Sequence, residues 1–300
     1  MNMMTKNKKS LTIFTPTYNR ANFLLKLYQC LSDQTSKDFI WMVIDDGSTD
    51  ETESVIQKMI RDGKIAIDYV KKNNGGKYTA YNMAVKRCKT DLIFIAMDSD
   101  DSLKSNAIEK IIFDWKTVKN EDVVGMVYMC EDANGKLMLS EYDEEELKKC
   151  PSLQAATVNG WFSGEAEYVF KTKYLNNYLY PERKGETFFN ELYSYIQMTG
   201  AMVWHKDSIY IRAYQEGGIT KNFLRTVVKS PLNYADYANV VSKYLPSFFK
   251  KVKYTLYYNT FSSYGGRHGY AANSFNPAMS YLLLPLGFVA SKLLKMKFNS

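Results

Sequence analysis

The 300-residue chain has few of the residues that build disulfide frameworks or nitrogen- and sulfur-ligated metal sites. Its four cysteines are scattered and form no Cys-x-x-Cys pair, and the only histidines are His205 and His268. Scattered cysteines of this kind are typical of reduced thiols in an intracellular protein, and the set does not favour a zinc site. Any metal is therefore expected to be held by oxygen ligands.

Long apolar runs are also scarce. Residues 1–10 are polar and Lys-rich, without the apolar stretch of a secretory signal, which predicts a cytoplasmic protein. Near the other end, the apolar part at 278–290 is shorter than the roughly 20 residues of a spanning helix and contains Pro285. The sequence therefore does not favour a transmembrane helix.

Two further function classes lack their sequence signals. No Gly-x-Gly-x-x-Gly follows the first apolar segment, where Pro16 and Tyr18 stand instead, so a nicotinamide-dependent dehydrogenase is not expected. The net charge is +7, yet the lysines converge on no nucleic-acid-binding motif, so no nucleic-acid partner is expected. What the chain does have in excess is tyrosine, 24 residues, whose flat rings with a polar tip suit sugars, interfaces or membrane headgroups.

The first third of the chain alternates between two patterns. Short apolar segments predict strands, and segments with helical spacing of apolar residues lie between them, so the sequence predicts an α/β fold with a mostly parallel sheet flanked by helices. The predicted strands are 11–17, 39–44, 65–70, 92–97 and 123–130, and the predicted helices are 21–34, 49–62, 78–88 and 105–118. Residues 161–218 lack clean periodicity and are predicted to form substrate-facing loops rather than core.

Polar motifs follow four of these strands. Asp98, Asp100 and Asp101 come directly after the strand at 92–97, and carboxylates this close repel one another unless a cation lies among them. An isolated Asp-x-Asp is equally typical of a solvated turn that caps a helix. Here, however, the segments 15–20, 45–50 and 73–77 supply polar residues at three other strand ends, where ligands of parallel sheets bind. Together the motifs predict a site for a phosphate-bearing ligand and Mg²⁺ or Mn²⁺.

These motifs resemble the family 2 glycosyltransferases, which have the GT-A (Rossmann-like) fold. The resemblance covers Leu11 to about Ser102 and is carried by Thr-Pro-Thr-Tyr-Asn-Arg at 15–20, Asp-Asp-Gly-Ser-Thr-Asp at 45–50, Asn-Gly-Gly-Lys at 74–77 and Asp-Ser-Asp-Asp at 98–101. It implies that Asp46 contacts the nucleotide base, Asp98 the ribose or donor sugar, and Asp100 the metal, with Asp101 as the alternative in a shifted register. The other implied donor-binding residues are Pro16, Tyr18, Arg20, Lys77 and Asn82.

The second half resembles bacterial transferases that assemble capsular, exo- or lipopolysaccharide repeat units. The resemblance is carried by segments 163–170, 180–191 and 214–220. It implies a carboxylate that deprotonates the acceptor hydroxyl, and Glu186 is the chosen base, with helix capping as its structural alternative. Glu165 and Glu191 are the alternative bases and acceptor-site residues, and Trp161 either stacks on a sugar or packs in the core.

The sequence therefore predicts a GT-A catalytic domain at 1–221, with a nucleotide-sugar half to about residue 118 and an acceptor half at 119–221. A helical, Tyr/Lys-rich extension follows at 222–300. The expected function is inverting, metal-dependent transfer from a UDP-sugar to a glycan or lipid-linked acceptor; the alternative is a non-catalytic glycan- or nucleotide-binding module. The extension is predicted to contact the cytoplasmic membrane face or, alternatively, to pack on the catalytic domain. Its lysines flank apolar segments at Lys243, Lys250, Lys251, Lys253, Lys292, Lys295 and Lys297.

Overall fold

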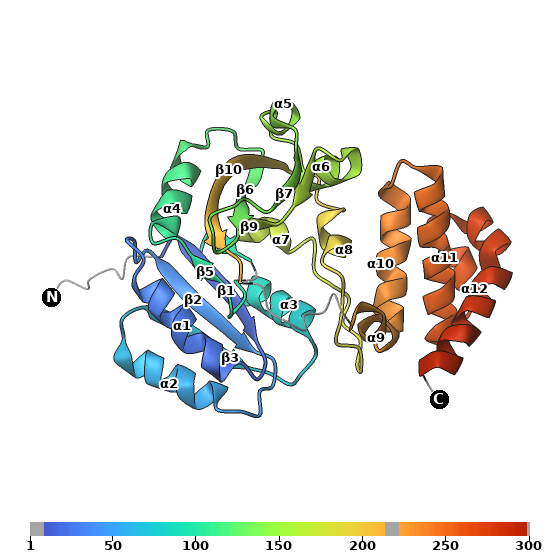
Figure 1. The fold of residues 1–300 in the computed structure, drawn as a ribbon, viewed down its shortest axis with the longest axis horizontal. Coiled ribbons are helices and arrows are strands. Elements are labelled where there is room, and N and C mark those ends of the chain that lie inside the picture. The colour runs from blue at the N-terminus through green and yellow to red at the C-terminus, as the bar shows by residue number, and fades with distance from the viewer. Residues whose placement is uncertain (1–8, 96, 214–221, 299–300) are drawn as a thin grey trace.

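The computed structural model describes residues 9–95, 97–213 and 222–298. Within these ranges the chain forms an α/β part followed by a helical part, which lie side by side (Figure 1). The motif at 214–220 lies outside the described residues, so its contribution stays a prediction.

The α/β part contains ten strands within the described ranges: β1 (Leu11–Thr17), β2 (Phe39–Asp45), β3 (Ala66–Lys71), β4 (Leu92–Phe94), β5 (Ser102–Leu103), β6 (Val123–Glu131), β7 (Leu139–Tyr142), β8 (Phe162–Gly164), β9 (Ala166–Lys171) and β10 (Ala201–Ile211). Its helices are α1 (Ala21–Ser32), α2 (Thr52–Asp62), α3 (Lys77–Arg87), α4 (Ala107–Thr117), α5 (Glu144–Leu147), α6 (Leu153–Asn159), α7 (Thr172–Leu175) and α8 (Leu192–Tyr195). The helical part comprises α9 (Phe223–Val228), α10 (Pro231–Tyr244), α11 (Phe248–Tyr264), the 3₁₀ turn η2 (Tyr270–Asn273) and α12 (Pro277–Phe298).

The central sheet has eight strands in the order β3-β2-β1-β4-β9-β6-β10-β5. The first four run parallel, as do β6 and β10, whereas β9 and β5 run antiparallel to their neighbours. One face is covered by α1, α2 and α4, and the other by α3 together with part of the helical extension. This architecture confirms the predicted mostly parallel α/β fold with a helical C-terminal extension.

The end of β4 differs from the expected strand and shapes the site. Sheet pairing stops at Phe94 instead of continuing through residue 97. The chain still runs beside its neighbours, because Ile95 N–H donates to the Tyr168 carbonyl at 3.2 Å and Met97 N–H donates to the Phe14 carbonyl at 2.8 Å. The acidic motif is thereby brought to the carboxyl end of β1.

The prediction that 161–218 consists of loops was wrong. Strand β9 lies in the middle of the sheet and β10 lies one strand from its edge, and Phe170 and Tyr210 are fully buried. Polar residues interrupt their apolar patterns, such as Glu167 in β9 and the run His205 to Asp207 in β10. Because the apolar pattern is interrupted, hydrophobic periodicity does not predict these two core strands.

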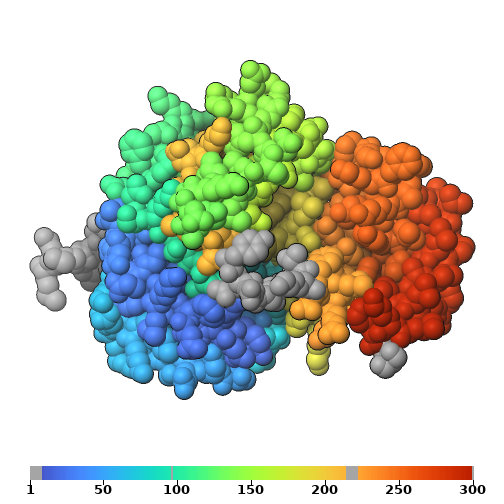
Figure 2. Space-filling model, in the orientation of Figure 1, coloured from blue at the N-terminus to red at the C-terminus, as the bar shows by residue number. Residues whose placement is uncertain are grey.

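A polar clasp joins the helical part to the α/β part. The segment 183–188, which we call the clasp, lies against the first turn of α10. Arg183 pairs with Asp236 and donates a 2.8 Å hydrogen bond to the Asn233 side chain. The Ser230 hydroxyl accepts hydrogen bonds from the backbone N–H groups of residues 187 and 188. Figure 2 shows the helical part as one end of the molecule; the domain boundary at 221/222 stays a prediction.

Candidate active site

The loops after β1 and β2 form one unit. Asn19 has a positive φ of 52°. Its N–H donates to the Ser48 hydroxyl at 2.9 Å, and its side-chain oxygen accepts a hydrogen bond from Thr49 N–H at 2.8 Å. Tyr18 projects outward with 48% of its surface exposed, and Pro16 lies within β1. The two motifs are therefore held together at one edge of the sheet.

Asp46 organises the next loop. Its carboxylate accepts hydrogen bonds from the N–H groups of Gly75 (2.9 Å) and Gly76 (2.6 Å) and pairs with Lys72 at 2.6 Å. Gly76 has a φ of +91°, and a Cβ atom on it would lie 1.8 Å from the Thr187 carbonyl oxygen. Only glycine fits this approach. In this structure Asp46 holds the loop, and its contact with a nucleotide base stays a prediction.

The acidic motif divides between the protein interior and the surface of the site. Asp101 is 5% exposed and accepts hydrogen bonds from the Tyr210 hydroxyl and Ala213 N–H, both at 2.7 Å. Burial raises its pKa above the usual value. Asp100 instead forms an ion pair with Arg20 at 2.8 Å. The shifted register is therefore disfavoured, since Asp101 is already engaged in the interior, and Asp98 and Asp100 are left for a ligand.

The carboxylates suit a metal ion whose remaining ligands come from the substrate. Within the described ranges no three His, Cys, Asp or Glu side chains gather closely enough to hold an ion on their own. Asp98 and Asp100 offer hard oxygen ligands from a single turn. Mg²⁺ and Mn²⁺ are commonly bound by one or two carboxylates together with substrate phosphates and water. The donor set fits such an ion in the presence of a diphosphate.

A polar cleft of about 250 Å³ adjoins this motif. The Lys77 ammonium lines the cleft, 3.1 Å from an Asp98 oxygen and 3.0 Å from a Glu191 oxygen. Burial lowers the pKa of Lys77, but the two carboxylates outweigh it and leave that pKa above its usual value. Those two oxygens are at most 6.1 Å apart, the sum of the two distances. The acidic and basic residues that line the cleft are Lys77, Asp98, Glu165, Glu167, Glu191 and Arg212.

Two of these residues were missed by sequence reasoning. Arg212 contacts Glu167 at 2.9 Å and Glu165 at 3.4 Å. Glu167 is 4% exposed, and burial raises its pKa well above the usual range, opposed by the Arg212 guanidinium. The signal in the sequence was Glu167, an acid inside the apolar part of a strand, because a buried acid needs a partner.

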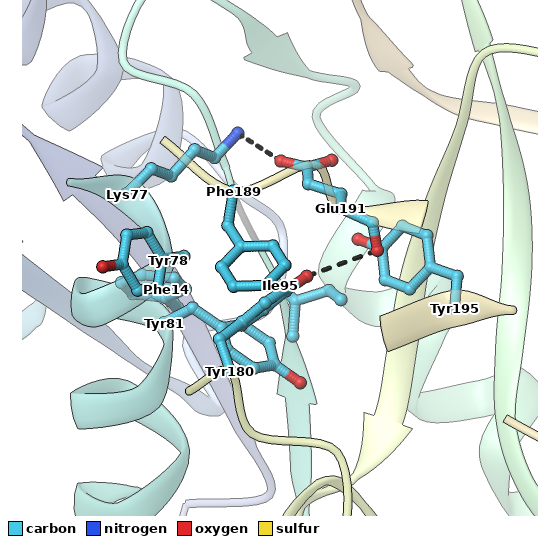
Figure 3. A pocket seen from close by; sticks show the side chains of 9 residues that line it. All are labelled: Phe14, Lys77, Tyr78, Tyr81, Ile95, Tyr180, Phe189, Glu191 and Tyr195. Carbon is cyan, nitrogen blue, oxygen red and sulfur yellow. Dashed lines mark hydrogen bonds and ion pairs between the residues drawn. The ribbon is translucent and has the colours of Figure 1, made fainter. Parts of the chain in front are cut away.

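A small aromatic pocket lies directly below the Lys77–Glu191 pair. Figure 3 shows the rings of Tyr78, Tyr81, Tyr180, Phe189 and Tyr195 beneath the two charged side chains. The Tyr180 hydroxyl donates a 3.3 Å hydrogen bond to the Glu191 carbonyl oxygen. These rings fix the backbone that presents Glu191 to the cleft, because a packed aromatic cluster leaves few alternative positions.

Asn82 supports this cluster instead of facing the donor motifs. It is 1% exposed, its amide nitrogen donates to the Tyr180 carbonyl at 2.8 Å, and its oxygen accepts from Tyr180 N–H at 2.9 Å. The expectation that Asn82 binds the nucleotide sugar is not supported by this geometry, since both ends of the amide are used at Tyr180.

Glu186 caps a helix. Its two oxygens accept hydrogen bonds from the N–H groups of Leu232 (2.9 Å) and Asn233 (2.7 Å) in the first turn of α10, and its side chain is buried. Backbone N–H groups at a helix start attract a carboxylate. This geometry does not support Glu186 as the base. Trp161 lies half-buried just before β8 and is likewise absent from the described cleft lining.

Comparison with known proteins identifies the group to which this arrangement belongs. Residues 12–194 match the family model of Glycosyl transferase family 2. The chain belongs to glycosyl transferase family 2. The matched range contains all four strand-end motifs together with Glu191, and of the cleft lining only Tyr195 and Arg212 lie beyond it.

Individual relatives of this family 2 member are distant. The chain is 25% identical over 244 residues to a Campylobacter jejuni GalNAc(5)-diNAcBac-PP-undecaprenol beta-1,3-glucosyltransferase, covering 78% of this chain and 75% of that protein. Its fold resembles Staphylococcus aureus TarS 1–349 in complex with UDP-GlcNAc (TM-score 0.58, 15% identity, 97% and 91% coverage). It also resembles a Pyrobaculum calidifontis mannosyltransferase in complex with GDP-Man and Mn²⁺ (TM-score 0.56, 15% identity, 98% and 89% coverage).

Proposed function

We propose that this family 2 glycosyltransferase is an inverting, metal-dependent enzyme. It transfers a hexose or N-acetylhexosamine from a nucleotide sugar, a UDP-sugar, to a glycan or lipid-linked acceptor on the cytoplasmic side of the membrane, in surface polysaccharide assembly. The UDP-GlcNAc bound by the structural neighbour TarS supports the donor class. The undecaprenol-linked substrate named for the Campylobacter jejuni relative supports the acceptor class.

One observation carries the proposal: Glu191 and Asp98 share the Lys77 ammonium. Asp98 belongs to the motif expected at the donor sugar, and Glu191 lies across the same cleft. A donor held by the first group and an acceptor hydroxyl beside the second would meet within a few ångströms, which is the spacing that in-line displacement needs. We therefore assign the base to Glu191, one of the alternatives from the sequence, in place of Glu186.

The step follows from these positions. Glu191 takes the proton from the acceptor hydroxyl as that oxygen forms a bond to the anomeric carbon on the face opposite the leaving group. The bond from the anomeric carbon to the diphosphate breaks, and its electron pair leaves with the nucleoside diphosphate. The ion pair with Lys77 requires the ionised form of Glu191, which is also the form a base needs. Arg212 adds a second cation beside the cleft.

Asp98 and Asp100 would hold Mg²⁺ or Mn²⁺ together with the donor diphosphate. Mn²⁺ in the structural neighbour with GDP-Man supports this ligand class. A bound divalent cation neutralises the charge that develops on the departing diphosphate. Arg20, which pairs with Asp100 in this structure, is positioned to move from that carboxylate to a phosphate oxygen.

The proposal is tested with full-length protein, Mn²⁺ and a panel of UDP- and GDP-sugars, measuring release of the nucleoside diphosphate with and without lipid-linked acceptor. We expect turnover with one donor class, lost in Glu191→Gln and retained in Glu186→Gln, which carries the same chemical change five positions away. Donor binding without turnover across the panel would instead favour a non-catalytic binding module. Retained transfer in Glu191→Gln would refute the assignment of the base.

A further inference from the structure

Charge is distributed unevenly between the two parts of the chain. Residues 222–300 contain ten Lys and Arg residues and a single acidic residue, Asp236, which gives a net charge of +9. Residues 1–221 contain 29 basic and 31 acidic residues, a net charge of −2. The extension therefore carries all of the excess positive charge of the protein.

Helix α12 packs on its neighbour through one narrow face. Ser280, Gly287 and Ser291 are the buried residues of this 22-residue helix. The Ser280 hydroxyl and carbonyl both bond to the Asn259 side chain in α11, at 2.5 and 2.8 Å. A Cβ atom at Gly287 would lie 2.6 Å from the Asn259 Cβ, so the two helices approach closely. One face of α12 is thus fixed against α11.

The opposite face of α12 is apolar and exposed. Its residues recur at the i, i+4, i+7, i+11, i+14 spacing of a single helical stripe. We call it the outer stripe: Leu282 (79% exposed), Leu286 (59%), Val289 (55%), Leu293 (60%) and Met296 (72%). On a helical projection Lys292 and Lys297 lie on either side of this stripe, and both are exposed. Water is a poor environment for such a continuous apolar surface.

Length and composition alone would let α12 cross a membrane, since Pro285 lies inside the helix and does not end it. Its fixed contact with α11 argues against that orientation. A spanning helix would have to leave α11, or would take Asn259 and the rest of the polar α11 surface into the lipid with it. A helix that lies flat exposes only the outer stripe to lipid and keeps the lysines at headgroup depth.

We propose that the outer stripe of α12, with its flanking lysines, is a docking surface for an anionic lipid bilayer, on which the helix lies parallel to the membrane plane. Charge complementarity selects this occupant, because an extension with a net charge of +9 attracts anionic headgroups and repels a second copy of itself. Helix α12 lies at the outer edge of the molecule, at the end away from the α/β part (Figures 1 and 2). The surface does not depend on the transfer reaction proposed above.

The test is vesicle flotation of the full-length protein. Phosphatidylcholine vesicles are compared with vesicles that contain about 30% phosphatidylglycerol, which supplies the anionic charge. We expect binding to the anionic vesicles only. The double variant Lys292→Glu, Lys297→Glu should lower the partition coefficient at least about 20-fold, because each lysine contributes about 1 kcal/mol and 1.4 kcal/mol is tenfold. Its control, Lys58→Glu, Lys116→Glu, reverses two exposed lysines of the α/β part and should bind like wild type.

A second variant tests the apolar component. Leu282→Ser, Leu286→Ser, Met296→Ser should also lose vesicle binding, whereas Leu25→Ser, Phe113→Ser, at exposed apolar positions of α1 and α4, should not. All three outer-stripe substitutions are on the surface, so the fold is retained. Donor hydrolysis without vesicles, measured on the same samples, should be unchanged in all variants, which separates failure of this proposal from failure of the enzymatic one.

Three results would overturn the proposal that the outer stripe docks on a bilayer. The first is equal binding to both vesicle types, or none. The second is resistance of the membrane-bound protein to extraction at alkaline pH, which would make α12 a spanning helix. The third is a protein that does not bind vesicles but forms a dimer in sedimentation equilibrium, with the dimer lost in the Leu282→Ser, Leu286→Ser, Met296→Ser variant. That result would make the outer stripe a contact between copies.

Discussion

The α/β part and the helical extension differ in where they place some of their polar and large apolar side chains. In the α/β part the core is apolar and the charged residues gather at the cleft. In the extension, Asn233, Asn259 and Ser280 are fully buried, while leucines of α12 face outward. The first arrangement is typical of a protein surrounded by water, and the second is the one on which the proposed contact with a bilayer depends. The difference teaches that substitutions in the two parts test different properties of the protein.

The extension obtains its tight packing from small and polar residues. Gly287 and Ser280 allow α12 to approach α11, and Asn259 bridges the two helices. Small residues at a close helix contact with interhelical hydrogen bonds are typical of helices that associate in lipid. The α/β part instead uses large side chains such as Trp41 and Phe94 between sheet and helices. Mutations should therefore have different consequences in the two parts.

The largest effect is expected in the cleft. Glu191→Gln removes the proposed base while it leaves the donor motifs intact, so transfer should fall by about 10²- to 10⁴-fold with unchanged donor affinity. Steady-state transfer and titration of the donor measure the two quantities. A parallel loss of donor affinity would mean that Glu191 supports the donor site and not proton transfer.

Asp100→Asn should cause the second-largest loss of activity. Removing one of two carboxylate ligands should lower divalent-dependent turnover by about 100-fold, the rate equivalent of several kcal/mol of charge stabilisation. Turnover is measured against the Mn²⁺ concentration. If Asp101→Asn reduces the metal response as strongly without loss of stability, the register of the motif assigned here is incorrect.

Gly76→Ala tests whether the donor loop depends on its contact with the clasp. The new Cβ atom would meet the Thr187 carbonyl and the residue would need a positive φ, so the free energy of unfolding should fall by at least about 2 kcal/mol. Gly135→Ala is the matched control, since Gly135 has a φ of +79° but no atom within 4 Å of its Cβ position. Denaturant unfolding of both variants should separate the contact from the backbone conformation.

Asn259→Ala probes the polar interior of the extension. It removes both hydrogen bonds to Ser280 and leaves that residue without its partner, which should lower the free energy of unfolding by about 1–3 kcal/mol. Urea unfolding followed by circular dichroism measures the change. Donor hydrolysis at low temperature should be unaffected, and a loss there would show that the two parts are coupled more closely than their contacts indicate.

The smallest effect is expected at the junction. Glu186→Gln weakens the cap of α10 and should lower the free energy of unfolding by about 1 kcal/mol, with transfer per folded molecule unchanged. Thermal unfolding and initial rates below the transition measure both. Loss of transfer beyond the loss of folded protein would restore Glu186 as the base.

Local patterns were sufficient for the first half of the fold. The predicted strand at 11–17 matches β1 residue for residue, because its β-branched and aromatic residues favour a half- or fully buried strand. The strand-end motifs gathered as expected, since the carboxyl ends of parallel strands share one edge. Strands β9 and β10 were missed because Glu167 and the polar residues of β10 break the pattern, and their partners lie far away in sequence.

The choice between Glu186 and Glu191 could not be made from the sequence. Both stand in the same segment of mixed composition, and what separates them is a contact 46 residues away, the N–H groups of Leu232 and Asn233 that take the Glu186 carboxylate. The lysines of the tail were visible in the sequence, whereas the direction of the outer stripe follows only from the contact of Ser280 and Gly287 with α11.

The clasp has a mechanical consequence. On one side Thr187 lies against Gly76 of the donor loop, and on the other the Ser230 hydroxyl holds the backbone of the clasp at the start of α10. The cleft therefore cannot tilt relative to the extension without breaking these contacts. If α12 rests on a bilayer, the clasp holds the cleft at a fixed height and angle above the membrane surface. The acceptor sugar would then be selected by its distance from the membrane.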